Sequence, residues 1–142
     1  MTCISLEQAQ RAIAGAIAEG EALELKPLSV AIVDAGSHLI ALARTDGAST
    51  MRPQISIGKA AGALALGVSS RRIAEMAVER PTFIGALAPH AFHGMVPAAG
   101  GIIIVDNDGR VIGAIGVTGD TSDNDEACAL AGITAAGLTA QG

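Results

Sequence analysis

Three side chains in the segment SHLIALARTDG, residues 37–47, could do chemistry: His38, Arg44 and Asp46. An imidazole and a carboxylate can take up and release protons, and a guanidinium can hold an organic acid through paired hydrogen bonds. If the segment forms a strand, alternation of side chains puts His38, Ile40 and Arg44 on one face. His38 and Arg44 would then lie about 20 Å apart, at ~3.3 Å per residue. We therefore expect that one small ligand cannot touch both side chains within a single subunit.

A second segment, GIIIVDNDGRVIGAIGVTGD at residues 101–120, has a similar apolar pattern but carries glycines where the first carries charge. Gly100 precedes this segment, Gly101 begins it and Asp120 ends it. If the two hairpins lie side by side with like ends together, these residues flank Arg44 and Asp46. The glycines would then offer room and bare N–H groups to a ligand. Asp120 would add a second carboxylate beside that of Asp46. The alternative is a surface ion pair between Arg44 and Asp46, with glycines that serve only twist and turns.

A lysine and two histidines elsewhere could also bind a ligand. Lys59 lies in ISIGKAAGALALG, where its side chain either reaches the surface, which is the more common case, or points into a pocket and binds a carboxylate. His90 and His93 stand three residues apart in PHAFH, and on a helical turn they would share a face. Neutral imidazoles bind transition metals and haem iron. Pro89 interrupts a regular helix there, so two solvated loop histidines are the alternative.

Apolar periodicity and capping residues predict the elements that position these side chains. Ser5, with Gln8 three residues later, is expected to cap a helix that runs to about Leu25. Two hairpins are predicted over residues 28–45 and 101–118, and Gly36 is expected to supply the positive φ of the first turn. Further helices are expected over residues 53–67, from Ser69 or Ser70 to Ala77, and from Thr121 or Ser122 onward, the last with Ala127, Leu130, Ala131, Thr134 and Leu138 toward the core. Residues 81–100, which contain three prolines, are expected to be irregular.

The order of these elements predicts an α/β fold of the α+β kind. Helices would flank an antiparallel β-sheet built from the two hairpins, because hairpins separated by long helical connections favour antiparallel pairing. A chain of 142 residues is long enough to bury a core and fits one domain. We therefore expect a single domain over residues 1–142.

Composition narrows the classes of partner. The hydrophobic share is 50% and the charged share 16%, against about 25% charged in a typical soluble domain, so we expect a homo-oligomer that covers some apolar surface. The net charge is −5 and no basic stripe occurs, which argues against nucleic acid. No apolar run approaches the ~18 residues of a membrane span, so no membrane partner is expected. Cys3 and Cys128 have no paired spacing and the N-terminus lacks a secretory pattern, which predicts a cytoplasmic protein.

Three segments together resemble the GlcG/HbpS family, which includes the C-terminal domain of PduO-type proteins. They are VAIVDAGSHLIALARTDGAS at residues 30–49, KAAGALALG at 59–67 and VPAAGGIIIVDNDGRVIGAIGVTGDTSDNDEACALAG at 96–132. The resemblance implies a profilin-like fold and assembly into symmetric oligomers. It implies haem binding for some members and a place in catabolic pathways for others. The family's pocket positions correspond here to His38, Arg44, Asp46, Lys59, Gly100, Gly101 and Asp120, whereas PHAFHGM at 89–95 departs from the family.

The first function that fits is a small-molecule-binding protein of this family. It would bind haem or a related anionic ligand in an oligomer pocket, with His93 as the candidate ligand of the iron. Arg44 or Lys59 would hold the haem propionates. His90 and His38 are the other imidazoles available to the iron.

Two other functions remain open. One is a cofactor-free isomerase, hydrolase or deaminase that acts on a small organic carboxylate, with His38, Asp46 and Asp120 as its acid-base groups. The other is a non-catalytic structural or sensor subunit, which the apolar composition would also suit. The sequence alone does not choose between an enzyme and a binding protein.

Overall fold

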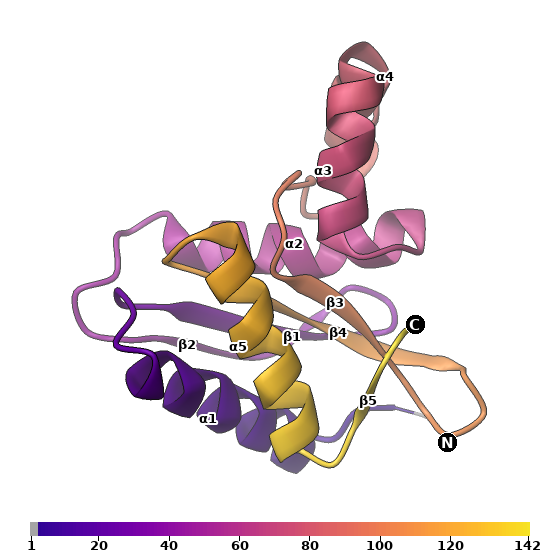
Figure 1. Cartoon of the computed structure of the whole chain (residues 1–142). Coiled ribbons are helices and arrows are strands. Elements are labelled where there is room, and N and C mark those ends of the chain that lie inside the picture. Colours follow the sequence, from indigo (N-terminus) through magenta and orange to yellow (C-terminus); the bar gives the residue numbers. More distant parts are fainter. Residues whose placement is uncertain (1–2) are drawn as a thin grey trace.

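The computed structural model describes residues 3–142, and its elements follow the predicted order (Figure 1). The helices are α1 (Leu6–Ala22), α2 (Arg52–Leu66), α3 (Ser70–Glu79), α4 (Pro81–Leu87) and α5 (Ser122–Ala135), with a 3-10 turn at Ala88–His90. The strands are β1 (Ser29–Asp34), β2 (Leu39–Arg44), β3 (Gly101–Val105), β4 (Val111–Thr118) and β5 (Thr139–Ala140). Within the described residues, no helix has the length and apolar character needed to cross a membrane.

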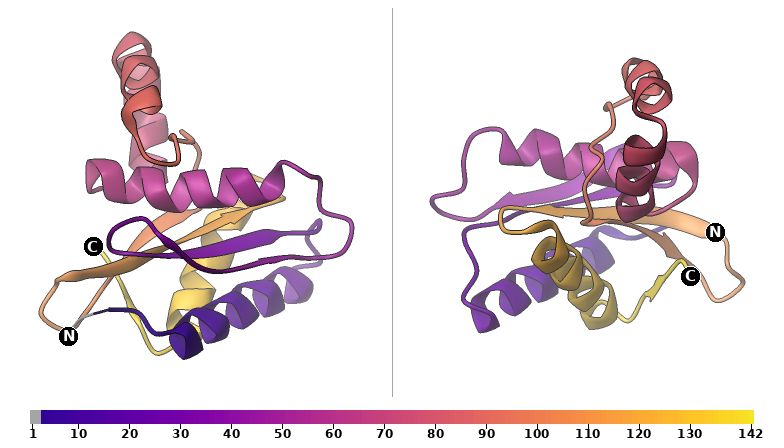
Figure 2. Two further views of the ribbon diagram at one scale, coloured as in Figure 1. Left: turned by 180° about the vertical axis from the view of Figure 1, so that it is seen from behind. Right: turned by 45° about the horizontal axis from the view of Figure 1, so that its top comes forward.

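The strands form one antiparallel sheet in the order β2-β1-β4-β3-β5. Figure 2 shows α1 and α5 on one face of the sheet and α2 across the other, while α3 and α4 project away. The predicted α+β fold, with helices flanking a sheet made mainly of two hairpins, is confirmed. The larger core lies under α1 and α5, where Val30, Ile32 and Ile115 meet alanines of both helices. On the other face α2 covers Val33 and Ala114.

The two hairpin turns share one geometry. Oδ1 of Asp34 accepts the N–H groups two and four residues later, at 2.9 and 3.0 Å, and Oδ1 of Asp106 does the same at 2.8 and 2.9 Å. The positive φ falls at Ser37 (68°) in the first turn and at Gly109 (81°) in the second. These two residues are equivalent once the aspartates are aligned. The prediction that Gly36 supplies the positive φ is therefore wrong by one position.

A β-bulge corrects the predicted alternation in β2. The pairing with β1 shifts register between Ile32 and Val33, which leaves Ile40 as the extra residue of β2. Ile40 packs against the core on the α1 side. Arg44 pairs with Ser29, whose hydroxyl lies 3.1 Å from a serine hydroxyl of α2 on the opposite face. Because a bulge reverses the side on which later residues point, Ile40 and Arg44 do not share a face as predicted.

Residues 81–100 are more regular than predicted. Pro81, in the segment expected to be irregular, lies in the first turn of α4, where the missing N–H would have had no partner within the helix. The 3-10 turn then follows directly. From residue 91 to residue 100 the chain is irregular, as expected.

The face of α5 that meets the core also differs from the prediction. Its buried positions are Asp125, Cys128, Ala129, Gly132 and Ile133. Leu130, predicted to face the core, is 42% exposed. Gly132 allows the two helices to touch, because a side chain there would overlap the carbonyl oxygen of Ala12 in α1. The small residues, rather than the largest apolar ones, therefore set the face.

Candidate functional site

The open ends of the two hairpins lie side by side. Ser29, at the start of β1, pairs with Arg44 of β2 on one side and with Thr118 of β4 on the other. The like-end arrangement that the sequence argument assumed is therefore confirmed by the strand register. Arg44 and Asp46 are both exposed at this end of the sheet.

Helix α2 fills the space beside the glycines at this end. A side chain at Gly100 would overlap the carbonyl oxygen of Val117, and one at Gly101 would overlap that of Lys59. The N–H of Gly101 already donates to Ser70 Oγ at 2.7 Å. The expectation that these glycines leave room for a ligand is wrong. Gly101 lets α2 lie directly on the sheet, whereas Gly100 has a φ of 129° and lies against β4 and the Lys59 side chain.

The Lys59 side chain points into the protein. The more common case for such a lysine, a side chain that reaches the surface, does not occur here. The Lys59 side chain is 3% exposed, and Nζ donates to the Val117 carbonyl oxygen at 2.9 Å and to Asp125 Oδ2 at 3.1 Å. Burial lowers the pKa of Lys59 and raises the pKa of Asp125, while the attraction between the two charges opposes both shifts. Asp125 Oδ1 also accepts the N–H of Asp120 at 2.9 Å. The carboxylate that Lys59 binds is thus one of the protein's own.

Asp120 braces the chain on both sides of the open end. Its Oδ1 accepts the N–H of Lys26 at 3.0 Å, and its Oδ2 accepts from the N–H of Thr121 at 2.9 Å and from Asn124 Nδ2 at 2.8 Å. These hydrogen bonds, that from Asn124 foremost, lower the pKa of Asp120 to about 2. Because a carboxylate of such low pKa is a weak base, the geometry favours a structural role over proton transfer.

Arg52 is the residue at this end that sequence reasoning missed. Its Nη1 donates to Thr118 Oγ1 at 2.9 Å. A cleft of about 240 Å³ opens beside it, lined by Lys26, Arg52, Gly119, Asp120 and Thr121. The position of Arg52 directly before Pro53 was the signal that could have identified it. Pro53 marks the first turn of the predicted helix, and that turn had to lie at one end of the sheet. Arg44 and Asp46 do not line this cleft.

The turn of the first hairpin meets the loop after α4 at the opposite end of β1. His38 Nδ1 lies 3.3 Å from Asp34 Oδ1. The ring centroids of His38 and Phe92 are 6.0 Å apart, and those of Phe92 and His93 are 4.3 Å apart, both edge to face. All three rings are exposed, and Phe92 is 75% accessible. We call His38, Phe92 and His93 the histidine patch.

His90 is exposed at the end of the 3-10 turn, and the ring contacts found among residues 3–142 do not include it. In the same part of the chain, no group of three or more His, Cys, Asp or Glu side chains is placed to hold a metal ion. The structure thus joins His38 with His93 and leaves His90 apart.

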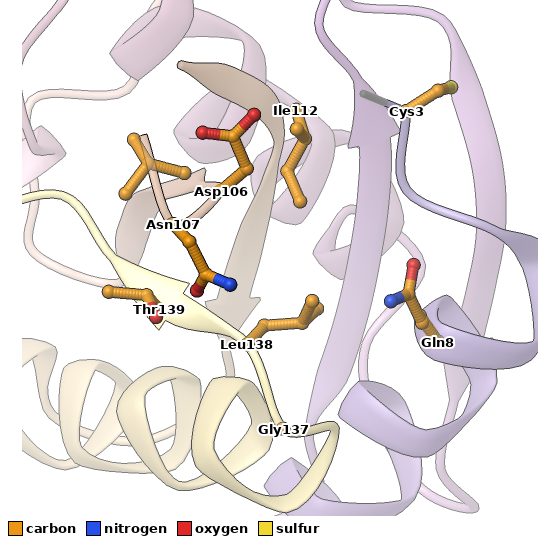
Figure 3. Close-up of a pocket in the computed structure, with 9 residues that line it drawn as sticks. Cys3, Gln8, Asp106, Asn107, Ile112, Gly137, Leu138 and Thr139 are labelled. Atoms are coloured by element: carbon orange, nitrogen blue, oxygen red, sulfur yellow. The ribbon is translucent and has the colours of Figure 1, made fainter. Parts of the chain in front are cut away.

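Another cavity, of about 270 Å³, lies between the N-terminal segment, the turn before β4 and the chain around β5 (Figure 3). Its lining includes Cys3, Gln8, Asp106, Asn107 and Leu138. Oδ2 of Asp106 is buried and has no hydrogen-bond partner among the described residues. In Figure 3 the Cys3 sulfur points away from Asp106. None of the residues predicted from the sequence to bind a ligand lines this cavity.

Comparison with known proteins agrees with the resemblance drawn from the sequence. A family model described as haem degrading protein HbpS-like matches residues 4–134. The crystal structure of HbpS has 28% sequence identity and a TM-score of 0.81, with 94% of this chain and 90% of that chain covered. No curated protein sequence matches this chain.

Two further solved structures show the same fold. The Klebsiella pneumoniae protein ORFY has 23% identity and a TM-score of 0.86, with 96% of this chain and 92% of that chain covered. The PduOC:heme complex has 21% identity and a TM-score of 0.86, with 99% of each chain covered. Because the HbpS-like model matches nearly the whole chain, this protein belongs to the HbpS-like family.

Proposed function

We propose that this protein binds haem, or a closely related tetrapyrrole, at the histidine patch. The observation that carries the proposal is the meeting of His38 and His93 around Phe92, with centroid distances of 6.0 and 4.3 Å. The matching family model is described as a haem degrading protein, and one structural relative, PduOC, was solved as a complex with haem. Both facts support haem over other ligands.

The donor set fits haem better than it fits a bare metal ion. A bare ion needs several protein ligands at once, and no group of three such side chains occurs among residues 3–142. Haem would supply the redox-active iron together with the four porphyrin nitrogens that bind it, so His38 or His93 could complete the ligands of the iron. Two exposed imidazoles beside an exposed phenyl ring would satisfy that smaller requirement.

His38 is the imidazole best prepared to bind iron. Asp34 Oδ1 lies 3.3 Å from its Nδ1, which leaves Nε2 free. Histidine ligands usually donate the second ring N–H to a carboxylate, which fixes the tautomer and raises the basicity of the ligating nitrogen. Burial acts to raise the pKa of Asp34, but the N–H groups of His38 and Gly36 and the nearby imidazole outweigh it, so that this pKa is lowered.

The cations first considered for the propionates do not fit this site. Lys59 is buried against Asp125, and Arg44 lies at the far end of the first hairpin from His38. Propionates at the histidine patch would therefore meet solvent or a neighbouring subunit. Because the patch is exposed, a second copy of the chain is the natural cover for the other face of the ligand, in keeping with the predicted oligomer.

Titration of haemin into the purified protein, followed by the Soret band, tests the proposal. We expect a saturable shift at micromolar protein. His38→Ala and His93→Ala should each weaken haemin binding by about tenfold or more, the scale of losing a ligand or its support. His90→Ala is the matched control, because it removes an exposed imidazole a few residues from the patch, and it should bind haemin as the unaltered protein does.

Asp34→Asn separates the positioning role of Asp34 from the fold. The amide keeps an oxygen that can cap the turn but loses the charge that faces His38, so we expect weaker haemin binding with an unchanged melting temperature. No saturable Soret shift, or unchanged titrations for both His38→Ala and His93→Ala, would refute the assigned site.

A further inference from the structure

The cleft beside Arg52 is a second polar cavity, at the other end of β1 from the histidine patch. Its volume is about 240 Å³, and it lies where the first turn of α2, the end of β4 and the chain before β1 come together. The two sites are separated by the length of β1, six residues or about 20 Å. A ligand of this cleft would therefore be distinct from a haem bound at the patch.

Arg52 is held with most of its hydrogen-bonding capacity unused. Its Nη1 donates to Thr118 Oγ1, and Thr118 is 1% exposed, so the guanidinium is anchored to a buried group. Thr118 is the hydrogen-bond partner found for it within residues 3–142. A guanidinium has five N–H donors in a planar fork, which leaves four for a ligand. That fork matches the two oxygens of a carboxylate.

The charges that line the cleft favour an anion. Lys26 and Arg52 supply two positive charges, and Asp120 supplies one negative charge. The carboxylate oxygens of Asp120 already accept from Lys26, Thr121 and Asn124, so they are directed at donors of the protein. The first of these bonds also fixes the backbone of Lys26 at the rim. Behind the cleft Lys59 and Asp125 neutralise each other.

From this geometry we infer that the cleft binds a small organic carboxylate, with Arg52 as the principal ligand-binding residue and Lys26 as the second cation. The small volume of the cleft, about 240 Å³, suits a small organic acid. This site does not depend on haem binding, and Arg52→Gln should leave the haemin titration unchanged.

Amide chemical shifts of the full chain, titrated with glycolate as the probe, test the inference. We expect saturable shifts at Gly119, Asp120 and Thr121, because their backbone surrounds the cleft. Arg52→Gln should weaken glycolate binding by about tenfold or more, the scale of a charge-assisted paired hydrogen bond. Arg52→Lys keeps the positive charge but loses the planar fork of N–H donors. Its affinity for glycolate should lie between those of the unaltered protein and Arg52→Gln. Lys26→Gln should cause a smaller loss.

Arg44→Gln is the matched control, since it removes an arginine from the same end of the sheet but outside the cleft. It should bind glycolate as the unaltered protein does. If Arg44→Gln and Arg52→Gln lost equal affinity for glycolate, general surface charge would explain the binding, and the inference would be overturned. The absence of saturation, full binding by both Arg52 variants, or binding of inorganic phosphate without glycolate would also overturn it.

Discussion

Lys59 and Asp125 tie together three elements that are distant in the sequence. The ammonium joins α2 to the carbonyl oxygen of Val117 in β4 and to the first turns of α5. The sequence showed a lone lysine among small apolar residues, for which a side chain at the surface is the more common case. The pairing of Lys59 with Asp125 could not be predicted, because the partners lie 66 residues apart and only the close approach of α2 to the sheet buries them.

At the residue scale, breaking this pair should destabilise the fold strongly. Lys59→Met leaves Asp125 as a buried charge without its partner, and we expect a loss of about 3–5 kcal/mol in the free energy of unfolding. The double variant Lys59→Met, Asp125→Leu should lose less, because no uncompensated charge remains. Urea denaturation measures both, and a loss below about 1 kcal/mol in the single variant would show that the pair does not hold the fold.

The histidine patch marks the limit of residue-level prediction. His38 was a candidate because an imidazole can transfer protons or bind iron, and His93 was a candidate because of its spacing to His90. Their meeting depends on the path of the chain after α4, which folds back so that Phe92 lies beside His38. A local sequence pattern contains no information about that path, and the pairing of His90 with His93 that it suggested is not the one found.

At the element scale, the hairpins and most helices followed from the sequence. The capping box at Ser5 and the serine and threonine caps of α3 and α5 are present as expected. Helix α4 was missed because Pro81 serves both to close α3 and to begin the next helix. The bulge at Ile40 was missed because an inserted residue leaves no mark in an apolar run. The role of the glycines was missed because close packing depends on a neighbour far along the chain.

The glycines that let α2 touch the sheet make a prediction for this element. A Cβ at Gly116 would overlap the carbonyl oxygen of Ser56, a backbone atom that cannot move aside cheaply. We expect Gly116→Ala to lower the free energy of unfolding by about 3 kcal/mol, at the upper end for overpacking. Gly85→Ala in α4 is the control, since nothing lies within 4 Å of its Cβ position.

Gly85→Ala should be neutral or stabilising by up to about 1 kcal/mol, because alanine is the better helix former. Thermal and urea unfolding of both variants give the comparison. Equal stability of Gly116→Ala and Gly85→Ala would mean that α2 does not pack as closely as the structure places it.

At the scale of the whole molecule, the sheet separates two kinds of surface. One end carries Arg52, Lys26 and the braced Asp120, and the other carries aromatic and imidazole rings. The assumption that like ends of the two hairpins meet predicted Arg44 at the first end, and the strand register confirms that assumption. Arg52 was not predicted there, because strand alternation does not show at which end of the sheet a helix begins.

Exposed apolar side chains predict that the chain assembles with copies of itself. Val78 on the projecting α3 is 85% exposed, and Phe92 is 75% exposed. Covering such residues is favourable at about 25 cal/mol per Å² of apolar area. Sedimentation equilibrium should give a mass that is a multiple of the single chain, and Val78→Lys or Phe92→Lys should reduce it. A single-chain mass at high protein concentration would contradict the expectation.

We expect His38 to hold the haem iron at the histidine patch. The Soret spectrum of haemin-loaded His38→Gly protein, before and after addition of imidazole, tests this role, because imidazole can replace the missing side chain. We predict an altered spectrum that imidazole restores toward that of the unaltered protein. A His38→Gly spectrum that already matches the unaltered protein without imidazole would contradict the claim.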